Sequence, residues 1–317
     1  MIIADLLRNT KNTLMSFELL PPLKGVNIRE IYNTIDPLME FNPSYINVTY
    51  HKEEVVYKKR SDGLLEQKVV RKRPGTVGIT AAIMHKYKIE VVPHLICAGF
   101  NCEETENALI DLNFLGIDNI LVLRGDPDKY TRRFEPQLDG HTYAIELLNQ
   151  IMELNKGKYI DNSEGCMSKT QFSVGVAGYP EKHAESPNME SDIRYLKAKV
   201  DLGAEYIVTQ MFFDNNRYFD FVERCRQEGI NVPIIPGIKP ISLKTHLNIL
   251  PNTFHVDIPE ELAIEVGKSK DNNEVRQIGI DWAIKQAKEL KAAKVPSIHF
   301  YTMGNSDNII KIAKEVF

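Results

Sequence analysis

The sequence predicts a single (β/α)₈ barrel of the TIM type. Short apolar runs rich in β-branched residues alternate with longer stretches of helical period from one end of the chain to the other. Eight such strand-helix units fit within the 317 residues, and a closed barrel needs eight units in about 250 residues or more. The early G-x-G-x-x-G fingerprint of a doubly wound dinucleotide-binding sheet is absent. One barrel domain over residues 1–317 is therefore expected.

Eight apolar segments are the expected barrel strands, because each is short, β-branched and bounded by polar or turn-forming residues. In chain order they are Leu14–Leu19, Tyr45–Thr49, Glu90–Ile96, Asn119–Leu123, Gln171–Val176, Tyr206–Gln210, Pro233–Ile238 and Ser297–Tyr301.

The stretches between these strands carry the apolar spacing of amphipathic helices, and a glycine at 116, 203 or 229 supplies a C-terminal stop for three of them. The expected helices are Ile28–Met39, Val77–Tyr87, Glu103–Leu115, Tyr143–Asn155, Ser191–Leu202, Tyr218–Glu228, Glu274–Lys291 and a last helix after Asp307.

Three segments depart from this regular alternation. Residues 53–73 place β-forming runs on both sides of Ser61-Asp62-Gly63, which predicts a hairpin excursion after the second strand. Residues 242–295 have room for two or three helices before the last strand. Residues 157–170 are polar and predict a mobile loop without chemistry at the bottom of the barrel.

Composition restricts the class of protein. The chain is 43% hydrophobic and 26% charged, and its net charge of −4 is too balanced for nucleic-acid binding to be expected. No apolar run approaches the roughly 20 residues of a membrane span, and the first residues lack the pattern of a signal peptide, so a soluble cytoplasmic protein is expected. The four cysteines show no C-x-x-C spacing and the histidines show no ligand spacing, so neither disulfides nor a metal site is expected.

Polar side chains gather where the expected strands end, which is where the active sites of such barrels lie. The first strand ends with Glu18, shortly before Pro21-Pro22. The third carries His94, and the fourth is followed by Arg124-Gly125-Asp126. Carboxylate, imidazole and guanidinium groups are thus expected to meet above the barrel axis.

With these motifs the sequence resembles the 5,10-methylenetetrahydrofolate reductase family over nearly its whole length. The matching motifs occur in the family's order: Phe17-Glu18 with Pro21-Pro22, Val48-Thr49-Tyr50, Pro93-His94-Leu95, Leu123-Arg124-Gly125-Asp126, Tyr179-Pro180-Glu181 with His183, Thr209-Gln210 with Phe212-Phe213-Asp214, Ile235-Pro236-Gly237-Ile238, and His299-Phe300-Tyr301-Thr302.

The resemblance implies a (β/α)₈ barrel that binds FAD without a Rossmann motif and commonly assembles into dimers or tetramers, hence a homo-oligomer. It implies the reduction of 5,10-methylenetetrahydrofolate to 5-methyltetrahydrofolate for methionine biosynthesis, with NADH or NADPH as electron donor in a ping-pong sequence. About sixteen residues follow Tyr301, so the S-adenosylmethionine-binding regulatory domain of eukaryotic members is expected to be absent and the chain to be of the bacterial type, the catalytic domain only.

Family correspondence also implies the roles of individual residues. Glu18 matches the proton donor that opens the five-membered ring of the substrate, and Asp126 matches the aspartate near flavin and pterin. The residues implied for FAD are Thr49, Tyr50, His94, Leu123, Arg124, Gly125, Asp126, Tyr143, Ala144, Tyr179, His183, Asp192 and Lys199, and those implied for the folate are Glu18, Thr49, Asp126, Gln210 and Tyr301.

The chain departs from the family's common pattern at three positions. Tyr195 stands where asparagine is common, and Ala198 and Asn305 stand where arginine is common. The first two positions bear on FAD binding and the third on the anionic tail of folate.

Two other classes of function stay open from the residues alone. An aldolase-type lyase on the same barrel needs a Schiff-base lysine, for which Lys239 after the seventh strand is the nearest candidate. A non-enzymatic partner subunit would carry no flavin. The choice between NADH and NADPH, the oligomeric state and the role of the hairpin are not readable from the sequence.

Overall fold

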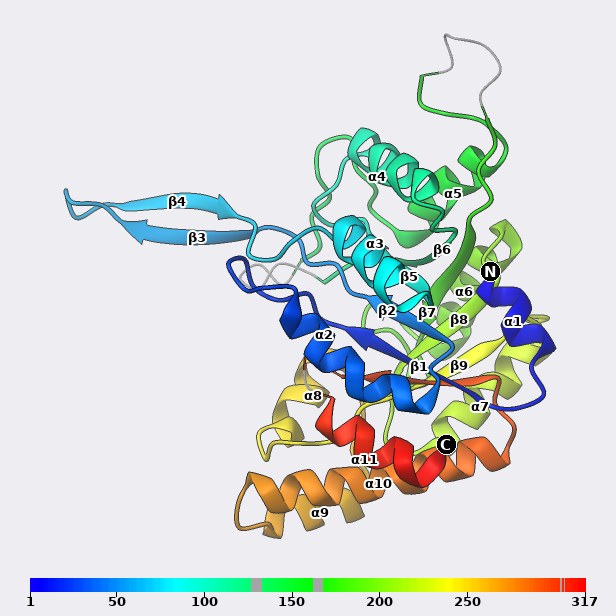
Figure 1. Cartoon of the computed structure of the whole chain (residues 1–317). Coiled ribbons are helices and arrows are strands. Elements are labelled where there is room, and N and C mark those ends of the chain that lie inside the picture. Colours follow the sequence, from blue (N-terminus) through cyan, green and yellow to red (C-terminus); the bar gives the residue numbers. More distant parts are fainter. Residues whose placement is uncertain (127–132, 162–167, 303, 305) are drawn as a thin grey trace.

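The computed structural model describes residues 1–317 except 127–132, 162–167, 303 and 305. Its centre is a closed barrel of eight parallel strands in the order β1-β10-β9-β8-β7-β6-β5-β2, surrounded by helices (Figure 1). The barrel strands are β1 (Leu14–Leu19), β2 (Tyr45–Val48), β5 (Glu90–Ile96), β6 (Asn119–Leu123), β7 (Ser173–Gly178), β8 (Tyr206–Met211), β9 (Ile234–Ile238) and β10 (Ser297–Tyr301). The predicted fold class is confirmed.

Four strands have the bounds predicted from the sequence, and β7 differs most. It begins at Ser173, two residues later than expected. The reason is local, because the Asn155 side chain at the end of α5 accepts a hydrogen bond from the Phe172 backbone N–H and donates one to its carbonyl. These bonds hold the backbone of Phe172 against the helix end, and β7 begins at the next residue.

The surrounding helices follow the predicted alternation, with one division. The expected helix at residues 28–39 is split into α2 (Arg29–Ile35) and a 3₁₀ helix (Asp36–Phe41), since Pro37 cannot donate the backbone hydrogen bond that would continue the α-helix. The other helices between barrel strands are α3 (Thr76–Tyr87), α4 (Cys102–Phe114), α5 (Ala144–Asn155), α6 (Met189–Leu202) and α7 (Asn215–Gln227), and α11 (Asp307–Val316) follows β10.

The long passage before β10 forms three helices, the upper of the two predicted numbers. They are α8 (His246–Phe254), α9 (Glu260–Lys268) and α10 (Asn272–Ala292). Leu250, Leu262 and Val275 from these helices pack with Met211 and Phe213 in an apolar cluster beside the end of β8. This segment is therefore packed onto the barrel near the carboxyl ends of its strands.

Helix α1 (Ile3–Asn9) was not predicted, and it lies against the amino end of the barrel interior. Its residues Ile3, Ala4 and Leu7 pack with barrel side chains that include Tyr45 and Tyr206. A helix of seven residues is too short to show a period in sequence or to be stable without such packing.

The predicted hairpin is confirmed as β3 (Glu54–Lys59) and β4 (Leu65–Val70), an antiparallel pair that projects away from the barrel (Figure 1). In the predicted polar loop, residues 162–167 lie outside the described part of the chain. Among the described cysteines, Cys97, Cys102 and Cys225 are free thiols. No helix in the described residues is long and apolar enough to cross a membrane.

Candidate functional site

A carboxylate and two imidazoles meet inside the carboxyl end of the barrel. Residues of β1 alternate between its two faces, so Phe17 and Leu19 pack outward into the main core while Glu18 points inward. The Glu18 Oε2 atom lies 3.9 Å from Nε2 of His94 on β5 and 4.0 Å from Nε2 of His299 on β10. The Glu18 side chain is 12% exposed, so this group is almost closed off from water.

The two histidines are held by neighbouring strands. Nε2 of His94 lies 3.2 Å from the Asn47 amide nitrogen, which donates to it in the tautomer that we assign. Burial lowers the pKa of His94 to about 4, which makes this ring neutral near pH 7. The His299 Nδ1 atom is 2.9 Å from the Ser16 hydroxyl, and its buried Nε2 has no hydrogen-bond partner among the described residues.

Tyr301 lies beside this group and is fixed by the neighbouring strands. Its hydroxyl donates to the Thr209 carbonyl at 2.6 Å, and burial raises its pKa well above the usual value. A Cβ atom at Gly237 would lie 2.7 Å from this hydroxyl, so only glycine leaves room for it. Packing against Tyr301 therefore explains why glycine stands at position 237 of the Ile235-Pro236-Gly237-Ile238 motif.

The segment after β2 connects the site with the base of the hairpin. The Thr49 hydroxyl donates to the Leu19 carbonyl at 3.2 Å and lies 3.3 Å from Nε2 of His51. Tyr50 packs on the Phe100 ring and accepts a hydrogen bond from Arg71, which directly follows β4.

The segment after β6 places a cation and a glycine at the mouth of the barrel. Arg124 donates two hydrogen bonds of 2.6 Å to the carboxylate of Glu185. Gly125 has a φ of 90°, and a Cβ atom there would come within 3.0 Å of the Ala98 Cβ, so other residues would be strained. Asp126 is exposed, and the residues that follow it lie outside the described part of the chain.

The loop after β7 and helix α6 form the neighbouring part of the site. Asp192 accepts hydrogen bonds from the His183 backbone at 3.0 Å and from the Ser186 hydroxyl at 2.7 Å. The His183 ring meets the Tyr179 ring edge-on, with centroids 4.8 Å apart. Burial lowers the pKa of Lys199 to about 8, while the charge of Asp192 opposes this shift.

The remaining predicted residues are distributed around the same end. Leu123 is the last residue of β6 and packs with the interior cluster. The Oε1 atom of Gln210 on β8 accepts from the Met211 backbone at 2.9 Å. Tyr143, the N-cap of α5, is 55% exposed and directly precedes Ala144, the first residue of that helix. The structure thus joins Glu18, His94 and Tyr301 in one cluster and leaves Tyr143 and Asp126 at its exposed margin.

Sequence reasoning did not select His51, His299 or Asn47 for the site. Asn47 and His299 each lie two residues before a selected one, Thr49 and Tyr301, and share its face of the strand. Selecting every second strand residue, whose side chain points into the barrel, would therefore have identified both Asn47 and His299. His51 follows β2, and its pKa is lowered by burial and by Arg73, while the charges of Asp126 and Glu18 oppose this shift.

The departures from the family pattern fall on different parts of the molecule. On α6, Tyr195 is 62% exposed and Ala198 is also exposed. Asn305 lies outside the described residues.

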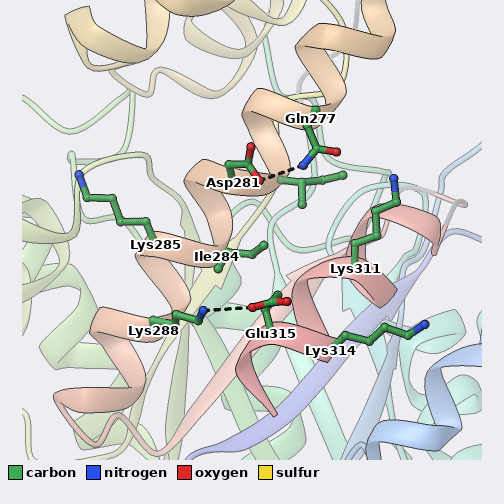
Figure 2. A pocket seen from close by; sticks show the side chains of 9 residues that line it. Gln277, Asp281, Ile284, Lys285, Lys288, Lys311, Lys314 and Glu315 are labelled. Atoms are coloured by element: carbon green, nitrogen blue, oxygen red, sulfur yellow. Dashed lines mark hydrogen bonds and ion pairs between the residues drawn. The ribbon is translucent and has the colours of Figure 1, made fainter.

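A surface cavity of about 770 Å³ lies elsewhere, on the outer face of the barrel between α10 and α11 (Figure 2). Lys288 and Glu315 pair across it at 3.3 Å, and none of the predicted site residues lines it. Over the described ranges, no cluster of three or more His, Cys, Asp or Glu side chains could hold a metal ion.

Fold and site together define a TIM-barrel protein with a buried carboxyl and imidazole cluster at the carboxyl end of its strands. The family model of methylenetetrahydrofolate reductase matches residues 3–316. The chain belongs to this oxidoreductase family, as the sequence motifs predicted.

Individual relatives agree with this assignment. The chain is 32% identical to methylenetetrahydrofolate reductase (NADH) 1 of Arabidopsis thaliana over 310 residues, which are 95% of this chain and 48% of the relative. It is 30% identical to 5,10-methylenetetrahydrofolate reductase of Escherichia coli over 294 residues, 92% of this chain and 87% of the relative. The chain thus spans about half the length of the plant and yeast relatives that it matches.

A solved structure supports the fold. An uncharacterised protein from Clostridium thermocellum that binds two copies of 5-methyl-5,6,7,8-tetrahydrofolic acid superposes with a TM-score of 0.57 at 13% identity, covering 98% of this chain and 97% of that protein.

Proposed function

We propose that this protein reduces 5,10-methylenetetrahydrofolate to 5-methyltetrahydrofolate, with electrons from NADH or NADPH and with FAD as the bound cofactor. The observation that carries the proposal is the Glu18 carboxyl, which lies nearly buried at the barrel mouth and faces two imidazoles. Family membership over residues 3–316 supports the choice of substrate.

Glu18 is the general acid in this proposal. The methylene carbon of the substrate bridges two nitrogens, and protonation of one of them allows that ring to open to an iminium cation. An acid for this step must reach the bound substrate in a site from which water is largely excluded, and the low exposure of Glu18 at the barrel mouth fits this requirement. His94 does not compete for this role, because its lowered pKa of about 4 keeps it unprotonated near pH 7.

Other residues would bind the folate around Glu18. Gln210 on β8 keeps its amide nitrogen as a donor, since its Oε1 already accepts from the Met211 backbone. Asp126 at the mouth would stabilise the cationic intermediate electrostatically. Thr49 and Tyr301 would line the same space from the segment after β2 and from β10.

The residues present fit FAD. The mouth of the barrel offers the cations Arg124 and Lys199 for phosphate and flavin oxygens, and the missing side chain of Gly125 permits close approach of the backbone. Arg124 would exchange its pairing with the exposed Glu185 for the cofactor. The cofactor, when bound, supplies the acceptor and donor of hydride. Tyr143, Ala144, Tyr179, His183 and Asp192 would complete the binding surface.

The test is an anaerobic titration of the purified protein followed by visible absorption. Oxidised flavin bands that bleach with NADH or NADPH and return with 5,10-methylenetetrahydrofolate would support both half-reactions. Bands that bleach without returning would contradict the folate assignment while leaving a flavin reductase. A protein that stays colourless after FAD is added would contradict the whole proposal and favour a non-enzymatic partner subunit.

A Schiff-base lyase is the second candidate, because Lys239 is buried and burial lowers its pKa to about 8. Such a lysine is partly unprotonated near neutral pH, as a carbonyl-attacking amine requires. Borohydride reduction in the presence of aldehyde or ketone substrates, followed by mass spectrometry of the Lys239 peptide, would detect the trapped adduct.

A further inference from the structure

We propose that Lys239 is a positioning residue for the folate half-reaction, with its ammonium group controlling whether the Glu18 carboxyl is protonated. The inference rests on the proposed acid role of Glu18. It gives the buried lysine a function that needs no covalent adduct.

Strand geometry points the Lys239 side chain at the Glu18 cluster. On β9, Ile238 packs outward in the main core and Ile235 packs inward with the barrel interior, so Lys239 is an inward position. Ile238 pairs with Phe300, which puts Lys239 level with Tyr301, and Tyr301 pairs with Glu18. Lys239 and Glu18 therefore flank Tyr301 at the same height of the barrel.

The Lys239 side chain is buried, and its ammonium group has no partner among the described residues. The residue is 7% exposed, and in the described part of the chain it makes no hydrogen bond or ion pair. A buried cation without a partner is unfavourable unless a nearby negative charge compensates it. Glu18 supplies this charge, because its attraction raises the Lys239 pKa against the dominant lowering by burial.

Several titratable groups face the pair from other elements, and most are neutral near pH 7. His94 on β5 and His246 on α8 have pKa values lowered to about 4, and the pKa of Tyr301 on β10 is raised. The pKa of His51 after β2 is also lowered. His299 on β10 faces Glu18 at 4.0 Å, and Asp126 and Arg73 act on His51 at the margin.

The charge of Lys239 therefore interacts with Glu18 inside the barrel. This interaction affects the protonation of both side chains. The carboxylate holds the lysine proton, and the ammonium favours the carboxylate over the protonated acid. Removing the ammonium is therefore expected to leave Glu18 protonated to higher pH.

The test compares Lys239→Met, Lys239→Arg and the wild type as FAD holoenzymes, with each half-reaction measured separately across a pH series. In Lys239→Met, the pH at which folate reduction falls to half its maximum is expected to rise by about one unit, while flavin reduction by nicotinamide stays within about twofold. Lys239→Arg keeps a positive charge and is expected to keep the wild-type profile. Lys268→Gln, an exposed lysine change on α9, is the matched control.

An unchanged folate profile in Lys239→Met, or equal losses in both half-reactions, would overturn the proposal. The coupling is also measurable without turnover, by NMR titration of ¹³C-labelled lysine with the Lys239 signal assigned from Lys239→Met. Its midpoint is expected near pH 8 in the wild type and about one unit lower in Glu18→Gln. Equal midpoints would overturn the proposal, whereas a wild-type protein that never reduces folate would overturn the proposed function and leave the measured coupling intact.

Discussion

The two ends of the barrel interior are built from opposite kinds of side chain. At the amino end, α1 covers an apolar cluster that includes Val92 of β5 and Tyr206 of β8, and Leu14 of β1 packs against it. At the carboxyl end, the same strands carry Glu18 and His94, a carboxyl and an imidazole held close together. Strands β1 and β5 therefore contribute packing at one end and ionisable groups at the other.

This difference suggests a division along the barrel axis. The apolar amino end contributes to stability, and the ionisable carboxyl end is the place for the proposed chemistry. Apolar burial at the amino end stabilises the fold at every pH, because none of these contacts depends on a proton. Burial of ionisable groups at the carboxyl end lowers the pKa of His94 and of Lys239 and raises that of Glu181, each a shift away from the charged form. A change at one end should therefore affect stability, and a change at the other should affect rates and pH dependence.

The largest expected effect is on catalysis at the carboxyl end. Glu18→Gln removes the proposed acid but keeps the shape of the side chain, so folate reduction should fall by about 100- to 10,000-fold. Flavin reduction by nicotinamide should stay within about threefold, since that step needs no proton from Glu18. Stopped-flow absorbance of each half-reaction measures both, and equal losses would show that Glu18 is structural.

The next effect is on stability at the amino end. Asn119 is buried, accepts a hydrogen bond from the Ile3 backbone at 2.8 Å and donates to the Met1 carbonyl and to Glu90. Asn119→Ala should lower the free energy of unfolding by about 2 to 3 kcal/mol, because it leaves the buried Ile3 backbone N–H of α1 without its partner and removes the bond to the Met1 carbonyl.

Urea denaturation measures the decrease in the free energy of unfolding that Asn119→Ala causes. The matched control is Asn9→Ala, which removes one exposed bond to the Asp5 carbonyl and should cost less than about 0.5 kcal/mol. Both variants should keep wild-type half-reactions. A large catalytic loss in Asn119→Ala would show that the two ends of the barrel are coupled.

Most of the fold could be predicted from sequence, because each barrel strand is a short apolar run between polar ends. Four strands, including β1 and β10, have the predicted bounds. Two of the errors arose where a tertiary contact decided the outcome. Helix α1 is stabilised by packing on the barrel interior, and β7 begins late because the Asn155 side chain binds Phe172.

The candidate site was partly predictable for a related reason. Residues in recognisable motifs, such as Glu18 and Arg124, were selected from the sequence. The partners of these residues depend on how distant strands meet, as for His299 beside Glu18 and Glu185 on Arg124. Glu181 stands in a matching motif but was not selected, because its bond to the Asp257 backbone comes from the distant segment before α9.

A smaller effect concerns a second, largely buried carboxyl at the carboxyl end of the barrel. Glu181 Oε2 accepts from the Asp257 backbone at 2.9 Å, while Oε1 is buried without a partner in the described residues. Burial raises the pKa of Glu181 to about 7. Between pH about 4.3 and 7 the unfolded chain loses this proton while the folded protein keeps it, so stability should fall as pH rises through that window.

Glu181→Gln should remove this pH dependence while keeping the acceptor for Asp257. At pH 8, Glu181→Gln should have a higher free energy of unfolding than the wild type. Because Glu181 is partly exposed, solvent screening should limit this increase to about 1 to 2 kcal/mol, and the two proteins should differ little at pH 4. Urea denaturation of both proteins at the two pH values measures it. Glu265→Gln, an exposed change on α9, is the control. An equal effect of Glu181→Gln at both pH values would mean that packing and not ionisation is responsible.

The smallest effect is expected for the hairpin, which follows β2 at the carboxyl end but lies outside the barrel. Tyr57, Leu64 and Leu65 are each more than half exposed, and β3 and β4 pair with each other along their length. Replacing residues 57–67 by Asn-Gly would join the paired Val56 and Lys68 through a two-residue turn. Both half-reactions and the free energy of unfolding at high dilution should then change little, the latter by less than about 1 kcal/mol.

The hairpin variant also tests whether the carboxyl end contributes to stability through contacts between two copies of the chain. Arg71, which bonds the Tyr50 hydroxyl, is retained, so the site keeps its contact with the base of the hairpin. A wild-type free energy of unfolding that rises with protein concentration, while that of the variant does not, would show that the exposed apolar side chains pack against a second copy of the chain. In that case contacts between subunits at the carboxyl end would also stabilise the protein. The division between a stabilising amino end and an ionisable carboxyl end would then hold only within one chain.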